Sequence, residues 1–189
     1  AAHMENLESE DADDSDVDLL MKRLEFLIGR RPELMSSVLL RQNPHNVHEW
    51  LKRTKLYEDD PAKVISTFTE AVMTIEPSKA VGRLNFLWTK FANFYEINND
   101  LANARVIFEK ASQVNFKTVD DLSSIWTESV EMELRHHNKK EAVETARRAL
   151  AKPTGVSALD GSVQQRLFRS TKLWALCADT EESYGTLAT

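Results

Sequence analysis

The histidines are the residues of this chain whose type and spacing most resemble a metal-binding site. His45 and His48 lie three residues apart in "HNVH", a spacing that can place two imidazoles on one metal ion. No cysteine, aspartate or third histidine completes a set nearby, so both are interpreted as surface residues. His136 and His137 are consecutive, and consecutive residues do not share a helix face. The sequence therefore predicts neither a metal site nor a cofactor.

Nucleophiles and phosphate-binding loops give no stronger signal. The five glycines are spread along the chain and form no glycine-rich loop. Cys177 is the only cysteine, and its apolar helical surroundings are typical of a packed core thiol. A lone cysteine also fits a reducing compartment such as the cytosol or nucleus. We expect a protein that is not an enzyme.

Residues 135–148 form a locally basic segment, and charge of this kind attracts phosphate backbones. Proteins that bind single strands usually add exposed aromatic side chains for stacking, whereas the aromatic residues here fall on predicted core positions. A solvated face or a protein-binding rim is the preferred interpretation. The candidate contacts to a partner protein or to RNA are Arg135, Lys139, Lys140, Arg147 and Arg148.

The net charge of -6 comes from one stretch near the N-terminus. Residues 5–18, "ENLESEDADDSDVD", hold eight of the 30 acidic residues and no base, so 22 acids face 24 bases elsewhere. Residues 1–4, "AAHM", resemble a tag remnant. Together with the acidic run they predict a disordered linker over residues 1–14.

The four tryptophans reveal the elements that position these residues. Trp50, Trp88, Trp126 and Trp174 are separated by 38, 38 and 48 residues. A recurring interval of this length indicates a helical array or a propeller. The residue four positions after each tryptophan is never bulky, and the first helix is expected to end in a turn at "EDDP", "NND" or "HHNKK". One large ring near the start of the first helix of each unit can bridge its neighbours, so we expect Trp88 and Trp126 to be buried between repeats.

A second amphipathic run follows each of the first three turns, with small residues that let helix axes come close. The fold prediction is all-α, a right-handed α-α superhelix of helix-turn-helix units. The predicted repeat core consists of Trp50, Trp88, Trp126, Trp174, Ala71, Ala111, Ala149, Phe68 and Phe108.

Capping residues and prolines set the predicted boundaries. Ser15 with Asp18 resembles a capping box, Pro32 is expected to end the first helix, and Asn43–Pro44 to end a second. Ser162 with Gln165 predicts another capping box, opening one long helix over residues 163–184. The predicted segments are 15–43 (helix pair), 44–80, 81–117 and 118–153 (repeats), and 154–189 (linker and a helix of a truncated repeat).

The helix predicted over residues 163–184 carries apolar side chains on more than one side. No second helix is expected after it to cover them. Exposed apolar patches favour association. The sequence therefore predicts a homodimer through residues 163–184 as a consequence of the fragment boundary.

The repeat unit resembles the tetratricopeptide repeat but lacks its glycine. Trp at the start of the first helix and "ARVIFEKA" (104–111) in the second are similar to the half-a-TPR (HAT) repeat. The stretches "SVLLRQNPHNVHEWLKR" (37–53) and "LDGSVQQRLFRSTKLWALCADTEESYGT" (159–186) resemble the Syf-type pre-mRNA splicing factors, the family of XPA-binding protein 2. Residues 17–189 share this resemblance. Ala146, where the family has an aromatic residue, and the short first turn depart from the pattern.

The resemblance implies a nuclear scaffold of the spliceosome acting in pre-mRNA splicing. It also implies contacts with crooked-neck-type HAT proteins, the Aquarius helicase and the repair protein XPA, and through XPA a link to transcription-coupled DNA repair. A direct single-stranded RNA-binding module that uses residues 135–148 is the alternative. A peptide-groove adaptor of the tetratricopeptide type is a third.

Overall fold

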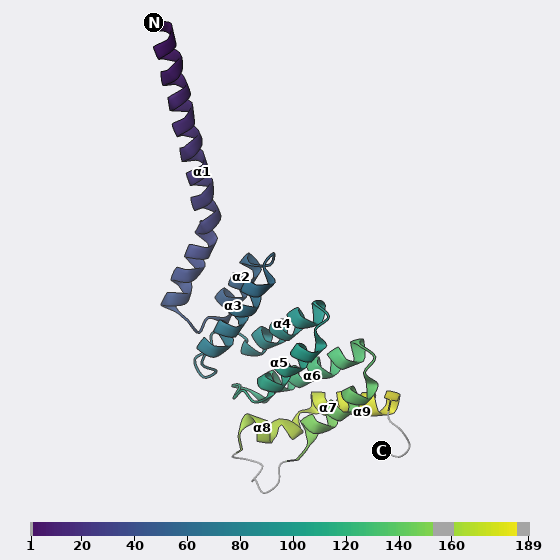
Figure 1. Cartoon of the computed structure of the whole chain (residues 1–189). Coiled ribbons are helices and arrows are strands. Elements are labelled where there is room, and N and C mark those ends of the chain that lie inside the picture. Colours follow the sequence, from purple (N-terminus) through teal and green to yellow (C-terminus); the bar gives the residue numbers. More distant parts are fainter. Residues whose placement is uncertain (1, 153–160, 185–189) are drawn as a thin grey trace. The chain divides into compact units, whose positions relative to one another are not determined.

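Apolar residues at helical spacing, with polar caps before them, fold this chain into helices joined by turns (Figure 1). The computed structural model describes residues 2–152 and 161–184, with side chains described from residue 16 onward. No β-strand occurs in those two stretches, where the single β-bridge joins Asn46 to Val81. The all-α class predicted from the sequence is confirmed. The chain divides into two compact units, Ala1–Pro44 and His45–Thr189.

Unit 1 is built from one long helix, α1 (Ala2–Gln42). The sequence predicted a disordered run, a helix from Ser15 and a break at Pro32, and the structure differs on all three points. Proline removes one helix hydrogen bond and kinks a helix, but the helix can continue beyond it. The axis of α1 bends in its C-terminal third, the part that contains Pro32 (Figure 1). The helix ends only at Asn43–Pro44, where the residue before proline is disfavoured in helical geometry.

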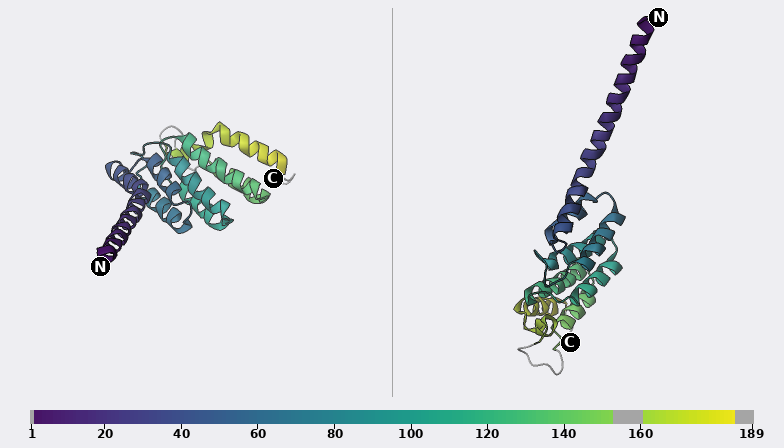
Figure 2. Two further views of the ribbon diagram at one scale, coloured as in Figure 1. Left: turned by 90° about the horizontal axis from the view of Figure 1, so that it is seen from above. Right: turned by 90° about the vertical axis from the view of Figure 1, so that its left-hand side faces the viewer.

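Unit 2 consists of helix pairs followed by a shorter segment. We call the first helix of each pair helix A and the second helix B. The pairs are α2 (Val47–Leu56) with α3 (Pro61–Thr74), α4 (Leu84–Ile97) with α5 (Leu101–Ser112), and α6 (Val119–Arg135) with α7 (Lys139–Leu150). Contacts also join α4 to α6 and α5 to α6, so each pair packs against the next. Figure 2 shows these helices stacked in chain order.

The turns inside the second and third pairs are built alike. Asn99 and His137 each stand eleven residues after the tryptophan of their unit, and both have a φ of 59°. The next residue in each turn donates its N–H to a carbonyl five positions back, at 2.9 Å in both cases. These residues, Asp100 and Asn138, are then the N-caps of helix B. The repeat therefore extends from the tryptophans to the backbone of the turn.

The linker between the first two pairs folds back onto the start of α2. Val47 donates its N–H to the carbonyl of Val81 at 3.0 Å, and Val81 donates to the carbonyl of His45 at 2.9 Å. Gly82 follows with a φ of +100°, a left-handed conformation that favours glycine. A Cβ at this position would lie 3.1 Å from Nε2 of His48.

The last segment differs from the single helix predicted over residues 163–184. It contains α8 (Val163–Arg166), the 3₁₀-helix η1 (Leu167–Arg169) and α9 (Thr171–Tyr184). The predicted capping box of Ser162 and Gln165 is confirmed at the start of α8. Ser170 interrupts the helix because its backbone is extended, at φ -69° and ψ 111°. Its carbonyl then accepts the first hydrogen bond of α9 from Trp174 N–H, so a new helix starts at a residue where the apolar periodicity predicted a continuous one.

Candidate functional site

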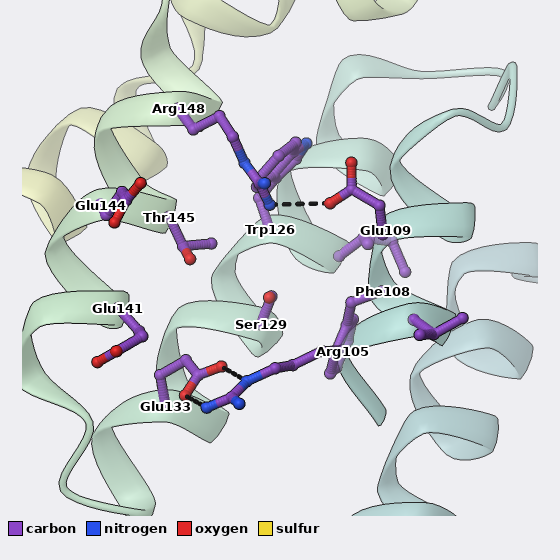
Figure 3. Close-up of a pocket in the computed structure, with 12 residues that line it drawn as sticks. Arg105, Phe108, Glu109, Trp126, Ser129, Glu133, Glu141, Glu144, Thr145 and Arg148 are labelled. Carbon is purple, nitrogen blue, oxygen red and sulfur yellow. Dashed lines mark hydrogen bonds and ion pairs between the residues drawn. The ribbon is translucent and has the colours of Figure 1, made fainter. Parts of the chain in front are cut away.

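A groove lies between helices α5, α6 and α7, and we call it the α5–α7 groove. Figure 3 shows α7 and α5 on either side of α6. The groove holds a pocket of about 340 Å³. Its lining residues are Arg105, Val106, Phe108, Glu109, Ile125, Trp126, Ser129, Glu133, Glu141, Glu144, Thr145 and Arg148.

Aromatic and aliphatic side chains form the floor of this groove. Phe108 and Ile125 are buried in the repeat core, whereas Trp126 is only partly covered. The guanidinium carbon of Arg148 lies 5.3 Å from the centroid of the Trp126 ring. A cation over an indole face is favourable, so this ring already binds one positive charge.

Arg105 and Glu133 are the best-defined polar contact of the groove. Nε and Nη2 of Arg105 donate to the two carboxylate oxygens of Glu133 at 2.6 and 2.7 Å, and Nδ2 of Asn138 donates to the same carboxylate at 2.9 Å. Burial acts to raise the pKa of Glu133, but the hydrogen bonds from Arg105 and Asn138 outweigh it, so the pKa lies below its ordinary value. Glu133 is therefore ionised and joins two successive helix pairs.

Two further arginine–glutamate pairs cross the same junction, between the second and third helix pairs. Arg135 of α6 donates to both oxygens of Glu96 in α4 at 2.9 Å. Nη2 of Arg148 in α7 donates to Glu109 in α5 at 2.9 Å. The Arg135 guanidinium also holds the pKa of Glu96 below its usual range. Each pair links residues that are 39 positions apart, about one repeat.

Most of the predicted basic segment is taken up by these contacts. Besides Arg135 and Arg148, Arg147 forms two hydrogen bonds with Glu181 of α9, the one between Nη2 and Oε2 measuring 2.8 Å. Nζ of Lys139 lies 4.8 Å from the centroid of the Tyr184 ring. Lys140 is exposed on α7. The structure thus spreads the segment over several junctions and does not gather it into one basic patch.

The acidic partners that these arginines have in neighbouring units could not be identified from the sequence. Glu133 and Glu181 both stand seven residues after the tryptophan of their unit. A glutamate recurring at that position was the available signal, but its arginine partners come from different turns of helix B. Arg105 and Arg147 follow their own tryptophans by 17 and 21 residues, so no fixed spacing identifies the pairs.

The predicted repeat-core residues are placed as follows. Trp50 and Trp88 are buried, Trp126 is intermediate, and Trp174 is 54% exposed. The prediction that Trp126 is buried and the predictions for Trp174 therefore need correction. Leu173 and Cys177 form the face of α9 that is buried, and Trp174 is turned about 100° away from it. The five other predicted core residues are buried: Ala71, Ala111, Ala149, Phe68 and Phe108.

Reactive groups give no competing site in the part of the chain that the structure describes. Its histidines, cysteine and acidic residues form no group of three that could hold a metal ion. Burial raises the pKa of the Cys177 thiol, and Glu181 raises it further, which makes the thiolate scarce. Within the same residues, no helix combines the length and the apolar character that crossing a bilayer demands.

Successive helix pairs with a tryptophan register and shared turn geometry define a helical-repeat protein of the HAT type. The family described as pre-mRNA-splicing factor Syf1/CRNKL1 C-terminal HAT repeat matches residues 77–189. The one described as pre-mRNA-splicing factor SYF1 middle HAT repeat matches residues 1–75. The chain belongs to the Syf1 family of HAT-repeat pre-mRNA-splicing factors.

Its relatives are similar along nearly the whole chain. The chain is 52% identical to the pre-mRNA-splicing factors SYF1 of Rattus norvegicus and Homo sapiens over 192 residues, which is 98% of this chain and 22% of each relative. It is 51% identical to the syf1 homolog of Drosophila melanogaster over 180 residues, 94% of this chain and 20% of that protein. The chain therefore spans about a fifth of the length of these relatives.

Proposed function

We propose that this chain is a non-catalytic section of a HAT-repeat scaffold that holds spliceosomal proteins together during pre-mRNA splicing in the nucleus. The observation that carries this proposal is the junction architecture. Arg105–Glu133, Arg135–Glu96 and Arg148–Glu109 all join the second helix pair to the third. Arg147–Glu181 joins the third pair to α9. Such pairs fix the geometry of one repeat on the next, and a stacked array presents an extended surface for partners. The names of the relatives supply the process.

The partners follow from the family resemblance and are part of the proposal. They are other spliceosomal proteins, specifically crooked-neck-type HAT proteins and the Aquarius helicase. Contact with XPA would extend the scaffold to transcription-coupled DNA repair.

A pull-down from nuclear extract tests this function. The tagged chain is incubated with nuclease-treated extract, and the bound proteins are identified by mass spectrometry. Enrichment of spliceosomal proteins over a tagged control repeat protein is the expected result. A bound set without splicing proteins would contradict the proposal.

Direct RNA binding through residues 135–148 is the alternative, and the ion pairs weigh against it. Arg135, Arg147 and Arg148 are each held by a carboxylate of the chain itself. We therefore expect a titration with single-stranded RNA at two salt concentrations to show no micromolar binding. Micromolar affinity that falls steeply with salt would instead support the RNA-binding module.

A further inference from the structure

We infer that the α5–α7 groove binds a basic segment of a partner protein, whose cationic side chain lies against Trp126 and the carboxylates of Glu141 and Glu144. This inference rests on the scaffold function proposed above and names the chemistry of one docking site within it. It concerns a protein segment, because the charges of the groove are unsuited to an anionic ligand.

The charge balance of the groove leaves two carboxylates uncompensated. Arg105 is held by Glu133, and Arg148 is held by Glu109. The remaining charged side chains of the lining are Glu141 and Glu144, one turn apart on α7 (Figure 3).

No ion pair to either of these two carboxylates occurs among the residues that the structure describes. The hydrogen bond to Glu133 is the main cause that raises the pKa of Arg105, and the charge of Glu141 raises it further. A cation entering the groove therefore meets a local excess of negative charge, whereas a phosphate would be repelled.

The remaining lining suits a long basic side chain. Val106, which is 47% exposed, and the accessible part of Trp126 offer apolar surface for a methylene stem. The hydroxyl groups of Ser129 and Thr145 can accept hydrogen bonds from a guanidinium or ammonium group. A pocket of about 340 Å³ falls within the range of ordinary ligand sites. Aromatic surface beside carboxylates is a combination that recognises cations.

The position of the groove in the array also favours a protein segment. Its walls are two successive B helices, and its floor is the A helix between them. An extended or helical peptide can lie along such a groove and insert one side chain into the pocket.

Peptide titrations followed by NMR test the inference. The probe is a short acetylated and amidated glycine peptide with one central arginine. The matched controls replace that arginine with citrulline, which is neutral and nearly isosteric, or with glutamate. The four indole N–H signals of the full chain are assigned with single Trp→Phe variants. A dissociation constant of about 1 mM suits one inserted side chain, and NMR detects affinities of this order.

We expect the arginine peptide to shift the indole signal of Trp126 and the citrulline and glutamate peptides to leave it unchanged. The double variant Glu141→Gln/Glu144→Gln should weaken arginine-peptide binding about fivefold or more, since each exposed charge contact is worth up to about 1 kcal/mol. The control double variant Glu70→Gln/Glu182→Gln makes the same charge change on exposed positions of α3 and α9. It should change the affinity less than about twofold.

Three outcomes would overturn the inference. An equal loss of affinity for the arginine peptide in the two double variants would show general charge attraction. Equal affinity for the citrulline and arginine peptides would show that the cation is not recognised. A shift of the Trp126 signal with single-stranded RNA but not with the arginine peptide would assign the groove to nucleic acid. The extract pull-down is independent of these readouts. A failed peptide titration with spliceosomal proteins still captured would remove the groove assignment and leave the scaffold proposal in place.

Discussion

At the scale of single residues, two features of unit 2 are decided by close contacts. The first is Gly82, whose φ of +100° is rarely adopted by residues with a side chain. An added Cβ would lie 3.1 Å from Nε2 of His48 and 3.4 Å from Cβ of Val47. The linker therefore needs glycine for both its backbone angle and its close approach to α2.

We expect Gly82→Ala to lower the free energy of unfolding by about 1–3 kcal/mol because both sources of strain act together. Urea denaturation followed by circular dichroism measures the change. Gly29→Ala is the matched control, since a Cβ at Gly29 meets no atom within 4 Å and alanine favours a helix. Equal stability losses in the two variants would show that the conformation at Gly82 is not the cause.

The second residue-scale feature is the Glu133 carboxylate, which is 4% exposed and bound by Arg105 and Asn138. We expect Arg105→Gln to cost about 2–3 kcal/mol, because it leaves a buried charge without its cation. Glu133→Gln should cost less, since Arg105 is nearly half exposed and water can solvate it.

The same carboxylate predicts a dependence of stability on pH. The pKa of Glu133 is lower in the folded state than its ordinary value of 4.5. Its contribution to stability is therefore fully present above the unfolded-state pKa and is lost as the pH falls through the folded-state pKa. Urea melts at neutral and acidic pH should show that acidification lowers the free energy of unfolding less for Glu133→Gln than for the parent chain. Parallel losses in both proteins would exclude Glu133 as a source of acid sensitivity.

At the scale of elements, helix A of each unit has one face toward the preceding pair and another toward its own helix B. In α4 both faces are covered, and Leu87 and Trp88 are buried side by side. In α9 only the first face is covered, so Leu173 is buried while Trp174 and Ala178 are exposed. Nε1 of Trp174 donates to the carbonyl of Phe168 at 2.6 Å. The tryptophans share one register but not one environment.

We expect Trp88→Ala to cost about 3–5 kcal/mol, the usual result of emptying a core site of this size. Trp174→Ala should cost at most about 1 kcal/mol, close to the value of one hydrogen bond. Urea denaturation of the two variants measures the difference. Similar large losses at both positions would mean that Trp174 is covered in solution.

That comparison also bears on the proposed homodimer through residues 163–184. Leu173→Glu, which the apolar pattern first suggests as a test, would introduce a charge into a side chain that is only 1% exposed, and so would disturb folding itself. Trp174→Glu places the charge on the exposed face instead. Sedimentation over a hundredfold concentration range, comparing the parent with Trp174→Glu, reports on association separately from stability.

At the scale of the whole molecule, the net charge of -6 is set by a short stretch of the chain. Residues 5–14 contain six acids and no base: Glu5, Glu8, Glu10, Asp11, Asp13 and Asp14. Deleting them brings the formal net charge to zero at pH 7. The run contains few apolar residues and therefore contributes little to a core.

We expect this deletion to change the melting temperature by no more than about 2 °C, since little apolar surface is lost. The solubility at pH 7 should fall, because a protein without net charge associates more readily. Thermal circular dichroism and the protein concentration after centrifugation measure the two effects. A large drop in the melting temperature would show that the run stabilises the folded chain.

The sequence by itself determined the features that depend on neighbouring residues. The tryptophan interval gave the all-α repeat class, and the serine and glutamine at 162 and 165 gave the start of α8. Helix periodicity, caps and turns act over a few residues, so a single sequence reveals them. The same local rules failed at Pro32 and Ser170, because a proline does not always end a helix and one extended residue can interrupt an apolar helical pattern.

Only the tertiary structure decided which charges meet and which faces are covered. Arg105 and Glu133 are 28 residues apart, and Arg147 and Glu181 in the next unit are 34 residues apart. Their pairing depends on how one helix pair packs on the next, which shifts the partner by a turn between units. The arginines of the basic segment predicted from the sequence thus form ion pairs within the chain. Within the described residues, the charges in the groove that have no ion pair are those of Glu141 and Glu144. Long-range packing sets these environments, because the field at a side chain comes from every helix around it.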